Sequence, residues 1–433
     1  MLRRTAAGLA LLGLLVPAAA RARTTFVLNH PDYPIIYSTA LDQPELNGVL
    51  TREGQVIHDE GEPVIFDAFI DTGASGFVVS HLHVSGDGGV PVFGFTPAEL
   101  LEEYDELGIS GTETGWVTSP FGVRLLDGAP GEGSAANLGD FNAHGEHGLW
   151  VRQSAGIGEN LILWTDPLNV VGMPAILGNA MVMDPKPLAD QERLRTYLLP
   201  DASSAPATNV TFSIRMREFS AGVPASLSTA ANPMLQNISL SHTAGDGVLR
   251  EVTDLEYLFD SGASGSFMDL STAKALEMVP DSATSVQDFV ENHHTGAVTV
   301  VGGIGGTMVV PIVQVDAFRV AADEGFDLCW RNAELMILDD DHLPISGVFG
   351  MNMLTPAMTL DYGALGLGDL TDMATLLDMD YLGQLIAMME DLLADLDPPG
   401  ALALSQPPID MSLLDDLLNA EISPGYFDDI VFD

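Results

Sequence analysis

The sequence Asp71-Thr72-Gly73-Ala74-Ser75-Gly76 returns later in the chain as Asp260-Ser261-Gly262-Ala263-Ser264-Gly265. The two copies differ only in Thr72 against Ser261, and a short apolar run precedes each of them. A three-residue Asp-Thr-Gly or Asp-Ser-Gly match occurs by chance in many chains, but a doubled six-residue match is hard to obtain by accident. The repeat therefore indicates a duplicated unit whose two copies each contribute one aspartate, Asp71 and Asp260, to a shared site.

Each position in the repeat has a structural reason. The apolar pairs Phe69-Ile70 and Leu258-Phe259 predict that each aspartate stands at the end of a buried strand. Gly73 and Gly262 allow a sharp turn without a side chain in the way. Thr72 and Ser261 supply hydroxyl groups that can bind neighbouring backbone groups. We expect these four residues to support the two aspartate loops; for either motif alone, a strand-end Asp that caps a turn is the alternative.

The composition predicts an all-β protein of two domains. The 433 residues suffice for two domains of ordinary size, and the 44 Gly and 26 Pro favour turn-rich β structure. The runs 64–70 and 210–216 read as strands, and the runs 297–301 and 308–313 read as a hairpin around a glycine cluster. A phosphate cradle is the alternative for that cluster, and it is disfavoured because no helical pattern follows.

The chain divides into five predicted segments. Its basic start and an apolar run too short to span a bilayer are typical of a secretory signal peptide, which predicts a secreted or periplasmic protein; an uncleaved anchor is the alternative. The last segment shows helical spacing of apolar residues with interspersed Asp, either packed on the protein or serving as a binding appendage. The predicted segments are a signal peptide (1–22), an N-terminal lobe (24–184), a linker (185–208), a C-terminal lobe (209–369) and an acidic helical tail (370–433).

The charge balance is strongly acidic. Asp and Glu number 61 against 16 Lys and Arg, which gives a formal net charge of −45. The resulting field repels nucleic acids and anionic membranes, so neither is expected as a partner, and no membrane insertion is expected. The chain holds a single cysteine, Cys329, so no internal disulfide can form. Its apolar surroundings predict a buried thiol, with an intermolecular bridge or a nucleophile as alternatives.

Other candidate metal ligands have weak patterns. His81 and His83 lie two residues apart and His293 adjoins His294, but no third His or Cys has ligand spacing. The acidic run 339–341 lacks the alternation of a calcium loop. Structural or solvated side chains are the favoured interpretation in each case. We expect neither a metal nor another cofactor.

The doubled motif resembles that of the pepsin-like (bilobal) aspartic proteases, in a bacterial-type exported form. In that family an apolar-apolar-Gly segment also passes under each aspartate loop, and Ile176-Leu177-Gly178 and Val348-Phe349-Gly350 are the candidates here. The resemblance covers roughly residues 40–369. It implies the pepsin-like acid protease fold with pseudo-two-fold symmetry.

The chain departs from the family at several places. Ala74 and Ala263 follow the glycines where many members have Ser or Thr, and the family's disulfides are missing. The segment 108–116 is the candidate for the flap that covers the site in this family. It lacks the family's flap tyrosine, and Trp116 is the candidate substitute, with a packing role as the alternative.

The resemblance implies an aspartic endopeptidase. Asp71 and Asp260 would be the catalytic pair that activates a water for attack on a peptide bond, with a polypeptide substrate, no cofactor and a monomeric protein. The first alternative is a secreted, non-catalytic binding protein on the same fold. The second is a precursor whose residues 24–45 or acidic tail block the cleft.

Overall fold

The computed structural model describes residues 24–27, 44–86, 89–108, 111–125, 142–153, 169–177, 179–184, 195–199, 211–219, 222–304, 306–339, 345–354 and 430–432. Strands dominate these residues, as the composition predicted, and the all-β expectation is confirmed. None of the helices within these residues is both long enough and apolar enough to span a membrane. The predicted signal peptide and almost all of the predicted helical tail lie outside the described residues.

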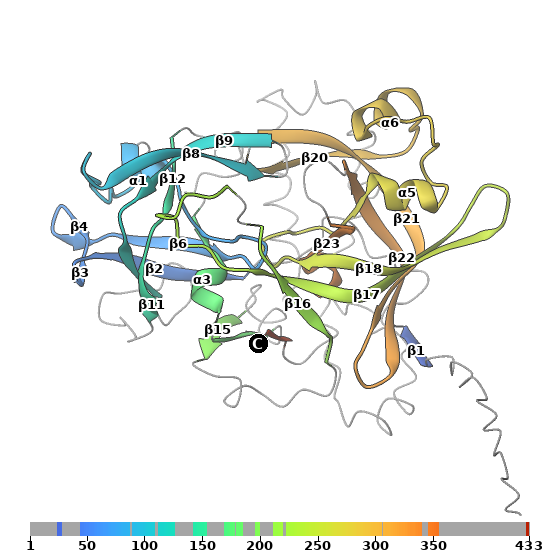
Figure 1. Cartoon of the computed structure of the whole chain (residues 1–433), viewed down its shortest axis with the longest axis horizontal. Helices are drawn as coiled ribbons and strands as arrows, with labels where there is room; N and C mark the ends of the chain where they lie inside the picture. Colours follow the sequence, from blue (N-terminus) through green and yellow to red (C-terminus); the bar gives the residue numbers. More distant parts are fainter. Residues whose placement is uncertain are drawn as a thin grey trace, which may run out of the picture.

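The first half of the chain forms a mixed sheet, and Asp71 follows its strand β6 (Figure 1). Its central strands are short and apolar. Strand β6, which leads to Asp71, lies between β2 and β13. We call β13 a crossing strand, because it pairs with the strands on both sides of the Asp71 loop, β6 and β7. In sheet order the strands are β11 (Asn142–His147), β10 (Phe121–Leu125), β2 (Glu45–Arg52), β6 (Ile65–Ile70), β13 (Val170–Val171), β7 (Phe77–Val79), β12 (Trp150–Arg152), β9 (Gly111–Thr118) and β8 (Leu100–Gly108), with β3 (Gln55–Val56) beside β2.

The second half forms a second sheet, which lies beside the first in Figure 1. Asp260 follows its strand β18, which pairs in parallel with the crossing strand β23. The hairpin predicted around the glycine cluster is present as β20 and β21. In sheet order the strands are β1 (Thr24–Val27), β22 (Phe326–Leu338), β19 (Phe267–Asp269), β23 (Gly347–Phe349), β18 (Leu249–Phe259), β17 (Asn232–Thr243), β21 (Gly306–Ala321) and β20 (Val298–Gly303), with β16 (Ile214–Arg217) beside β17.

Three strand pairings cross the predicted segment boundaries. Strand β1 was assigned to the first half, but it pairs in parallel with β22 of the second half. The predicted linker contains a strand, β15 (Arg195–Leu199), which pairs with β14 (Ala180–Asp184). At the end of the acidic tail, β24 (Ile430–Phe432) pairs with the other edge of β14. The β1–β22 and β14–β24 pairings join residues far apart in the sequence, so no local composition signals them.

Short helices and turns complete the described structure. Helix α5 (Leu270–Ala275) begins at Asp269, whose carboxylate accepts from the Thr272 N–H, and α6 (Val286–Asn292) begins at Ser285 in the same manner. The remaining short elements are α1 (Leu82–Ser85), α3 (Met173–Ile176), the 3-10 turn η4 (Met351–Met353) and the two-stranded pair β4 (His58–Asp59) and β5 (Glu62–Pro63).

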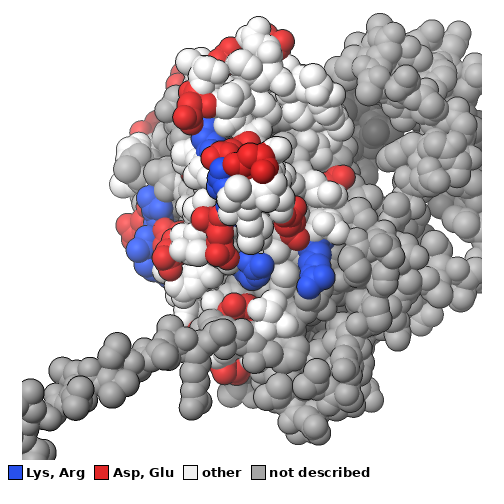
Figure 2. Space-filling view, turned by 90° about the vertical axis from the view of Figure 1, so that its right-hand side faces the viewer, with Lys and Arg blue, Asp and Glu red and all other residues white. Residues whose placement is uncertain are grey.

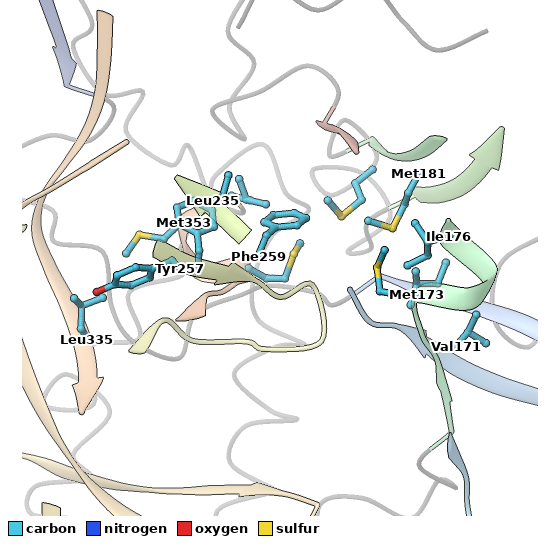
Figure 3. Close-up of a cluster of buried hydrophobic side chains, with 14 of the residues drawn as sticks. Val171, Met173, Ile176, Met181, Leu235, Tyr257, Phe259, Leu335 and Met353 are labelled. Carbon is cyan, nitrogen blue, oxygen red and sulfur yellow. The ribbon is translucent and has the colours of Figure 1, made fainter. Parts of the chain in front are cut away.

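One hydrophobic cluster runs through both halves. It includes Met173 and Ile176 of the first half and Phe259 and Met353 of the second, all labelled in Figure 3. All four side chains are buried, so the cluster removes apolar surface from water on both sides of the junction. The two halves therefore share a core. Cys329 is buried, as predicted, and burial raises the pKa of its thiol.

Surface charges of opposite sign are interspersed on the face of the second half (Figure 2). Arg250 contacts both Asp246 and Glu277, and Arg319 contacts Glu251. Pairs this exposed contribute little stability each.

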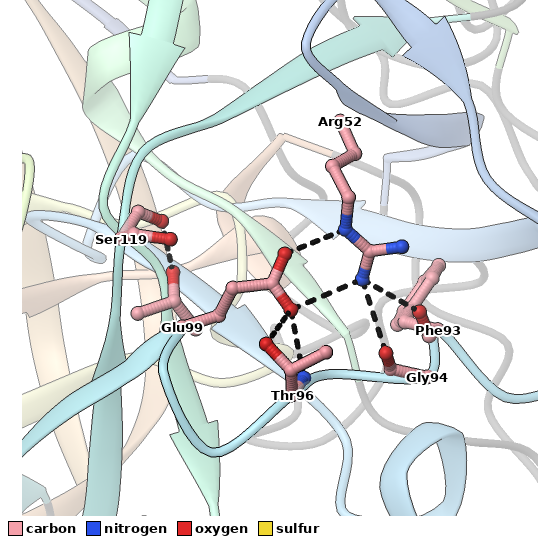
Figure 4. A network of polar contacts seen from close by, with 7 residues as sticks. Arg52, Phe93, Gly94, Thr96, Glu99 and Ser119 are labelled. Carbon is pink, nitrogen blue, oxygen red and sulfur yellow. Dashed lines mark hydrogen bonds and ion pairs between the residues drawn. The ribbon is translucent and has the colours of Figure 1, made fainter.

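A denser polar network ties a loop to strand β2 (Figure 4). Arg52 Nε donates to Glu99 Oε1 at 2.6 Å, and its Nη2 donates to the carbonyls of Phe93 and Gly94. Glu99 Oε2 also accepts from the backbone N–H and the hydroxyl of Thr96. Burial disfavours the ionised form, but the bonds from Thr96 and Arg52 prevail and hold the pKa of Glu99 below 4.5.

We expect Glu99→Gln to lower the free energy of unfolding by about 1 kcal/mol at pH 7, because a charge-assisted network loses its anion. The folded pKa of Glu99 lies below its unfolded value, so this stabilisation is present above the unfolded pKa and is lost as pH falls through the folded pKa. Chemical denaturation at about pH 7 and about pH 3 measures both effects. Glu218→Gln, at an exposed position, is the matched control; equal losses for Glu99→Gln at the two pH values would contradict the assignment.

Candidate active site

Each aspartate is held by the turn that follows it. Asp71 Oδ1 accepts from the N–H groups of Gly73 at 2.7 Å and Ala74 at 3.0 Å. Asp260 Oδ1 accepts from Gly262 at 2.9 Å and Ala263 at 3.0 Å. The two loops thus use the same bonds at equivalent positions. These donors stabilise carboxylates and fix their orientation.

A crossing strand supports each loop, and in the first half it is not the predicted one. The Asp71 N–H donates to the carbonyl of Val171, and the Asp260 N–H donates to that of Phe349. The crossing segments are therefore Val170-Val171-Gly172 and, as predicted, Val348-Phe349-Gly350. The predicted segment Ile176-Leu177-Gly178 is wrong: Ile176 ends α3, Leu177 is exposed and Gly178 lies outside the described residues.

Each crossing segment requires glycine at its third position, because a side chain there would clash with the aspartate loop. A Cβ atom on Gly172 would lie 2.0 Å from the carbonyl oxygen of Gly76, and one on Gly350 would lie 2.4 Å from that of Gly265. Both segments continue with a methionine whose N–H donates back to the aspartate loop, Met173 to Ala74 and Met351 to Ala263. The shared order Val-apolar-Gly-Met was the signal in the sequence that distinguishes the correct segment.

The two loops are bonded to one another through their hydroxyl residues. Thr72 Oγ1 donates to the carbonyl of Phe259 at 2.7 Å and accepts from the Ser261 N–H at 3.0 Å. Ser261 Oγ donates to the carbonyl of Ile70 at 2.6 Å and accepts from the Thr72 N–H at 3.1 Å. Both residues are buried. The predicted support residues Thr72 and Ser261 therefore bind across the two halves.

This exchange brings the two aspartates together. A Cβ atom on Gly73 would lie 2.5 Å from Cγ of Asp260, and one on Gly262 would lie 2.4 Å from Cγ of Asp71. Each predicted support glycine thus leaves the space that the opposite carboxyl group occupies. The two carboxyl groups lie close enough for each to change the pKa of the other.

Two neighbouring carboxyl groups cannot both ionise cheaply. Burial raises the pKa of Asp71. Burial also raises the pKa of Asp260 well above its ordinary value, and the negative charge of Asp71 raises it further. The pair therefore retains one proton to a higher pH than an isolated carboxyl group does.

The motifs gave no indication of one further supporting residue. Asn232 is buried, and its Nδ2 donates to the carbonyls of Thr72 and Gly73 at 2.9 Å each. Its Oδ1 accepts from the Ser75 hydroxyl at 2.6 Å. In the second half Asn352 accepts from Ser266. An asparagine so far from the repeat carries no local pattern by which the sequence could reveal it.

Both aspartates face the same side of their sheets as two smaller hydrophobic clusters. Ile70 and Phe259 point into the main core, so strand alternation directs Asp71 and Asp260 to the opposite face. In the first half this face carries a cluster with Val78 and Trp150. In the second half it carries one around Leu258, Val310 and Val348. The hairpins β8–β9 and β20–β21 contribute residues to these clusters, so each extends over an aspartate-bearing face.

The two hairpins meet near their tips, as Figure 1 shows. A Cβ atom on Gly108 would lie 2.2 Å from the carbonyl oxygen of Ile304. The predicted flap is therefore a hairpin, but Trp116 does not lie near its tip. Trp116 is partly buried and packs against the main core on the opposite face, which favours the packing alternative.

The other predicted candidates do not join the aspartates. His83 is buried against Phe93 with its Nδ1 bonded to the Pro91 carbonyl, and burial lowers its pKa. Among the described residues, no group of three or more His, Cys, Asp or Glu side chains could hold a metal ion. A hollow of about 520 Å³ lies beside the Asp71 loop, but neither aspartate lines it. Its lining includes His147, Pro174 and Ser228.

No protein-family model matches this chain, and a comparison with curated proteins finds no match. The geometry of the two loops is therefore the observation from which a function is inferred.

We expect Thr72→Val to lower the free energy of unfolding by roughly 2 to 4 kcal/mol, because the Ser261 N–H and the Phe259 carbonyl would lose a buried partner. Chemical denaturation measures the loss. Thr112→Val, an exposed position on β9, is the matched control, with a change within about 0.5 kcal/mol.

Adding Ser261→Val to Thr72→Val should cost less than the sum of the two single losses, because both hydroxyl groups join the same pair of loops. A strictly additive result would mean that the hydroxyl groups act independently, contrary to the reciprocal arrangement.

Proposed function

We propose that this protein is an aspartic endopeptidase with a two-lobed, pepsin-like architecture. The observation that carries the proposal is the contact between the Asp71 and Asp260 carboxyl groups at the junction of two equivalent loops. A strand-end aspartate that merely caps a turn has no need of a second carboxyl group beside it. Like-charge proximity of this kind costs stability, so it favours a chemical role.

The chemistry follows from a shared proton. One carboxylate accepts a proton from a water held between the pair as that water attacks the peptide carbonyl. The protonated carboxyl group donates a hydrogen bond to the carbonyl oxygen and stabilises the negative charge that develops there. The N–H groups of Gly73, Ala74, Gly262 and Ala263 keep both carboxyl groups oriented throughout.

The substrate in this proposal is a polypeptide in an extended conformation beneath the two hairpins. Strands β8 and β9 offer a hairpin edge for backbone hydrogen bonding to such a chain. The signal-peptide pattern at the start of the sequence supports a secreted or periplasmic location. The protein acts as a monomer in this proposal, because one chain supplies both aspartates.

We expect Asp71→Asn and Asp260→Asn each to reduce peptide hydrolysis on the order of a thousandfold or more, because neither variant can hold one ionised and one protonated group. A peptide mixture analysed by mass spectrometry detects the cleavage, and a statine-type inhibitor should bind the wild-type protein. Asp67→Asn, at an exposed position on β6, is the control with unchanged activity. Full activity in a folded Asp71→Asn/Asp260→Asn variant would refute the proposal.

The rate of peptide cleavage should follow a bell-shaped pH profile. Activity requires one proton on the pair, so it falls when the second proton binds at low pH and when the last proton leaves at high pH. The raised pKa of Asp260 displaces the alkaline limb above the range of an isolated aspartate, about pH 4. A profile of kcat/KM for one peptide tests this; an alkaline limb at about pH 4 would contradict the coupling.

A further inference from the structure

The hairpin β8–β9 has an inner and an outer face. Along β8, Glu103 and Asp105 are exposed, whereas Tyr104 and Glu106 are partly buried. Tyr104 belongs to the small hydrophobic cluster that contains Val78. Because side chains alternate along a strand, Glu106 projects from the same inner face as Tyr104.

The inner face of the hairpin continues to Asp71. In register order, Tyr104 lies opposite Gly115, and Gly115 lies opposite Arg152 of β12. Two residues earlier on β12, Trp150 lies opposite Val78, which in turn lies opposite Val170. Paired residues project from the same face of a sheet.

The last pairing in this series of strands leads from Val170 to the strand that precedes Asp71. Val170 lies beside Phe69 of β6, which shares a face with Asp71 two residues later. Glu106 and Asp71 therefore project from the same face of one sheet. The second half borders this face through Ile304, which packs into the cluster and contacts Gly108.

The carboxylate opposite Glu106 is already neutralised. Glu113 pairs with Glu106 in the hairpin register and binds Arg152 through two bonds of 2.8 and 2.6 Å. The side chains in that ion pair are 0% exposed for Arg152 and 9% for Glu113. Arg152 thus donates to both carboxylate oxygens of Glu113.

Glu106 has no such cation. Within the part of the chain that the structure describes, its carboxyl group makes no hydrogen bond or ion pair, and burial raises its pKa to about 7. From outside the hairpin, Val223, Leu227 and Ile304 pack into the hydrophobic cluster that contains Tyr104, and the Ser226 hydroxyl donates to Glu102. A partly buried carboxylate in these surroundings gains stability from any cation that enters beside it.

We infer that Glu106 receives a Lys or Arg side chain of a substrate polypeptide bound on the aspartate-bearing face of the sheet. The inference rests on the proposed peptidase function and names its substrate class, a basic polypeptide. The hairpin strengthens it, because β8 and β9 carry several Asp and Glu and neither Lys nor Arg. A long-range negative field favours the approach of basic chains.

The test compares peptides that differ at one position. A cleaved peptide is made in versions with Lys or the uncharged, unbranched norleucine at each position around its cleaved bond. We expect wild-type kcat/KM to favour Lys at one position by roughly tenfold, the worth of a charge-assisted hydrogen bond. The ratio should fall to about one in Glu106→Gln, whereas Glu103→Gln, on the outer face, retains it.

Two further measurements separate this inference from the proposed function. The Lys-to-norleucine ratio should be larger at about pH 8 than at about pH 5.5, because only ionised Glu106 attracts the cation; the aspartate pair affects both peptides alike. Binding of the same peptides to Asp71→Asn, with and without Glu106→Gln, shows the preference without cleavage.

The outcomes are distinct. A Lys preference in binding without any cleavage by the wild-type protein would support the role of Glu106 and refute the peptidase. Equal treatment of Lys and norleucine by the wild-type protein, or a Lys preference that survives Glu106→Gln, would overturn the role of Glu106 alone.

Discussion

The reciprocal hydrogen bonds between Thr72 and Ser261 are the constraint on which the rest of the site depends. Each hydroxyl group donates to one carbonyl and accepts from one N–H of the opposite half. Neither loop can therefore move without leaving buried polar groups unpaired. Side chains with only methyl groups at these positions would fill the space but satisfy none of the four bonds. The separation of the two aspartates is thus determined one residue away from them.

That constraint forces two acidic groups into one buried place, which is unfavourable by itself. Backbone N–H donors in each turn, the shared proton and the common hydrophobic core all offset the cost. Gly73 and Gly262 are part of the same solution, because any side chain there would occupy the position of the opposite carboxyl group. The site therefore combines two opposed demands, close approach of like charges and a rigid surrounding framework.

The hairpins show how the two halves diverge around an equivalent framework. Both extend over an aspartate-bearing face, yet their charges differ. Hairpin β8–β9 carries Glu113, which is neutralised by Arg152, and Glu106, which has no counter-ion among the described residues. Strand β20 and the facing residues 306–311 of β21 carry no charged side chain. The hairpin of the second half presents glycine and β-branched residues near its tip instead. Equivalent loops thus supply a symmetric pair of aspartates, while unequal hairpins make the surroundings of that pair asymmetric.

The composition by itself indicated the β-rich class. The repeat indicated the two aspartates and the support residues Thr72, Ser261, Gly73 and Gly262, because the steric and hydrogen-bonding needs of a tight turn are local and leave a local pattern. The crossing strand of the first half was misplaced, since two apolar-apolar-Gly segments stand six residues apart and only pairing with Phe69 and Ile70 selects Val170-Val171-Gly172. The tertiary structure decided the role of Asn232, the position of Trp116 and the pairing of β1 with the second half. It also decided that Glu106 has no ion-pair partner among the residues that the structure describes. Each depends on which distant strand lies alongside, and the local sequence does not predict such long-range pairing.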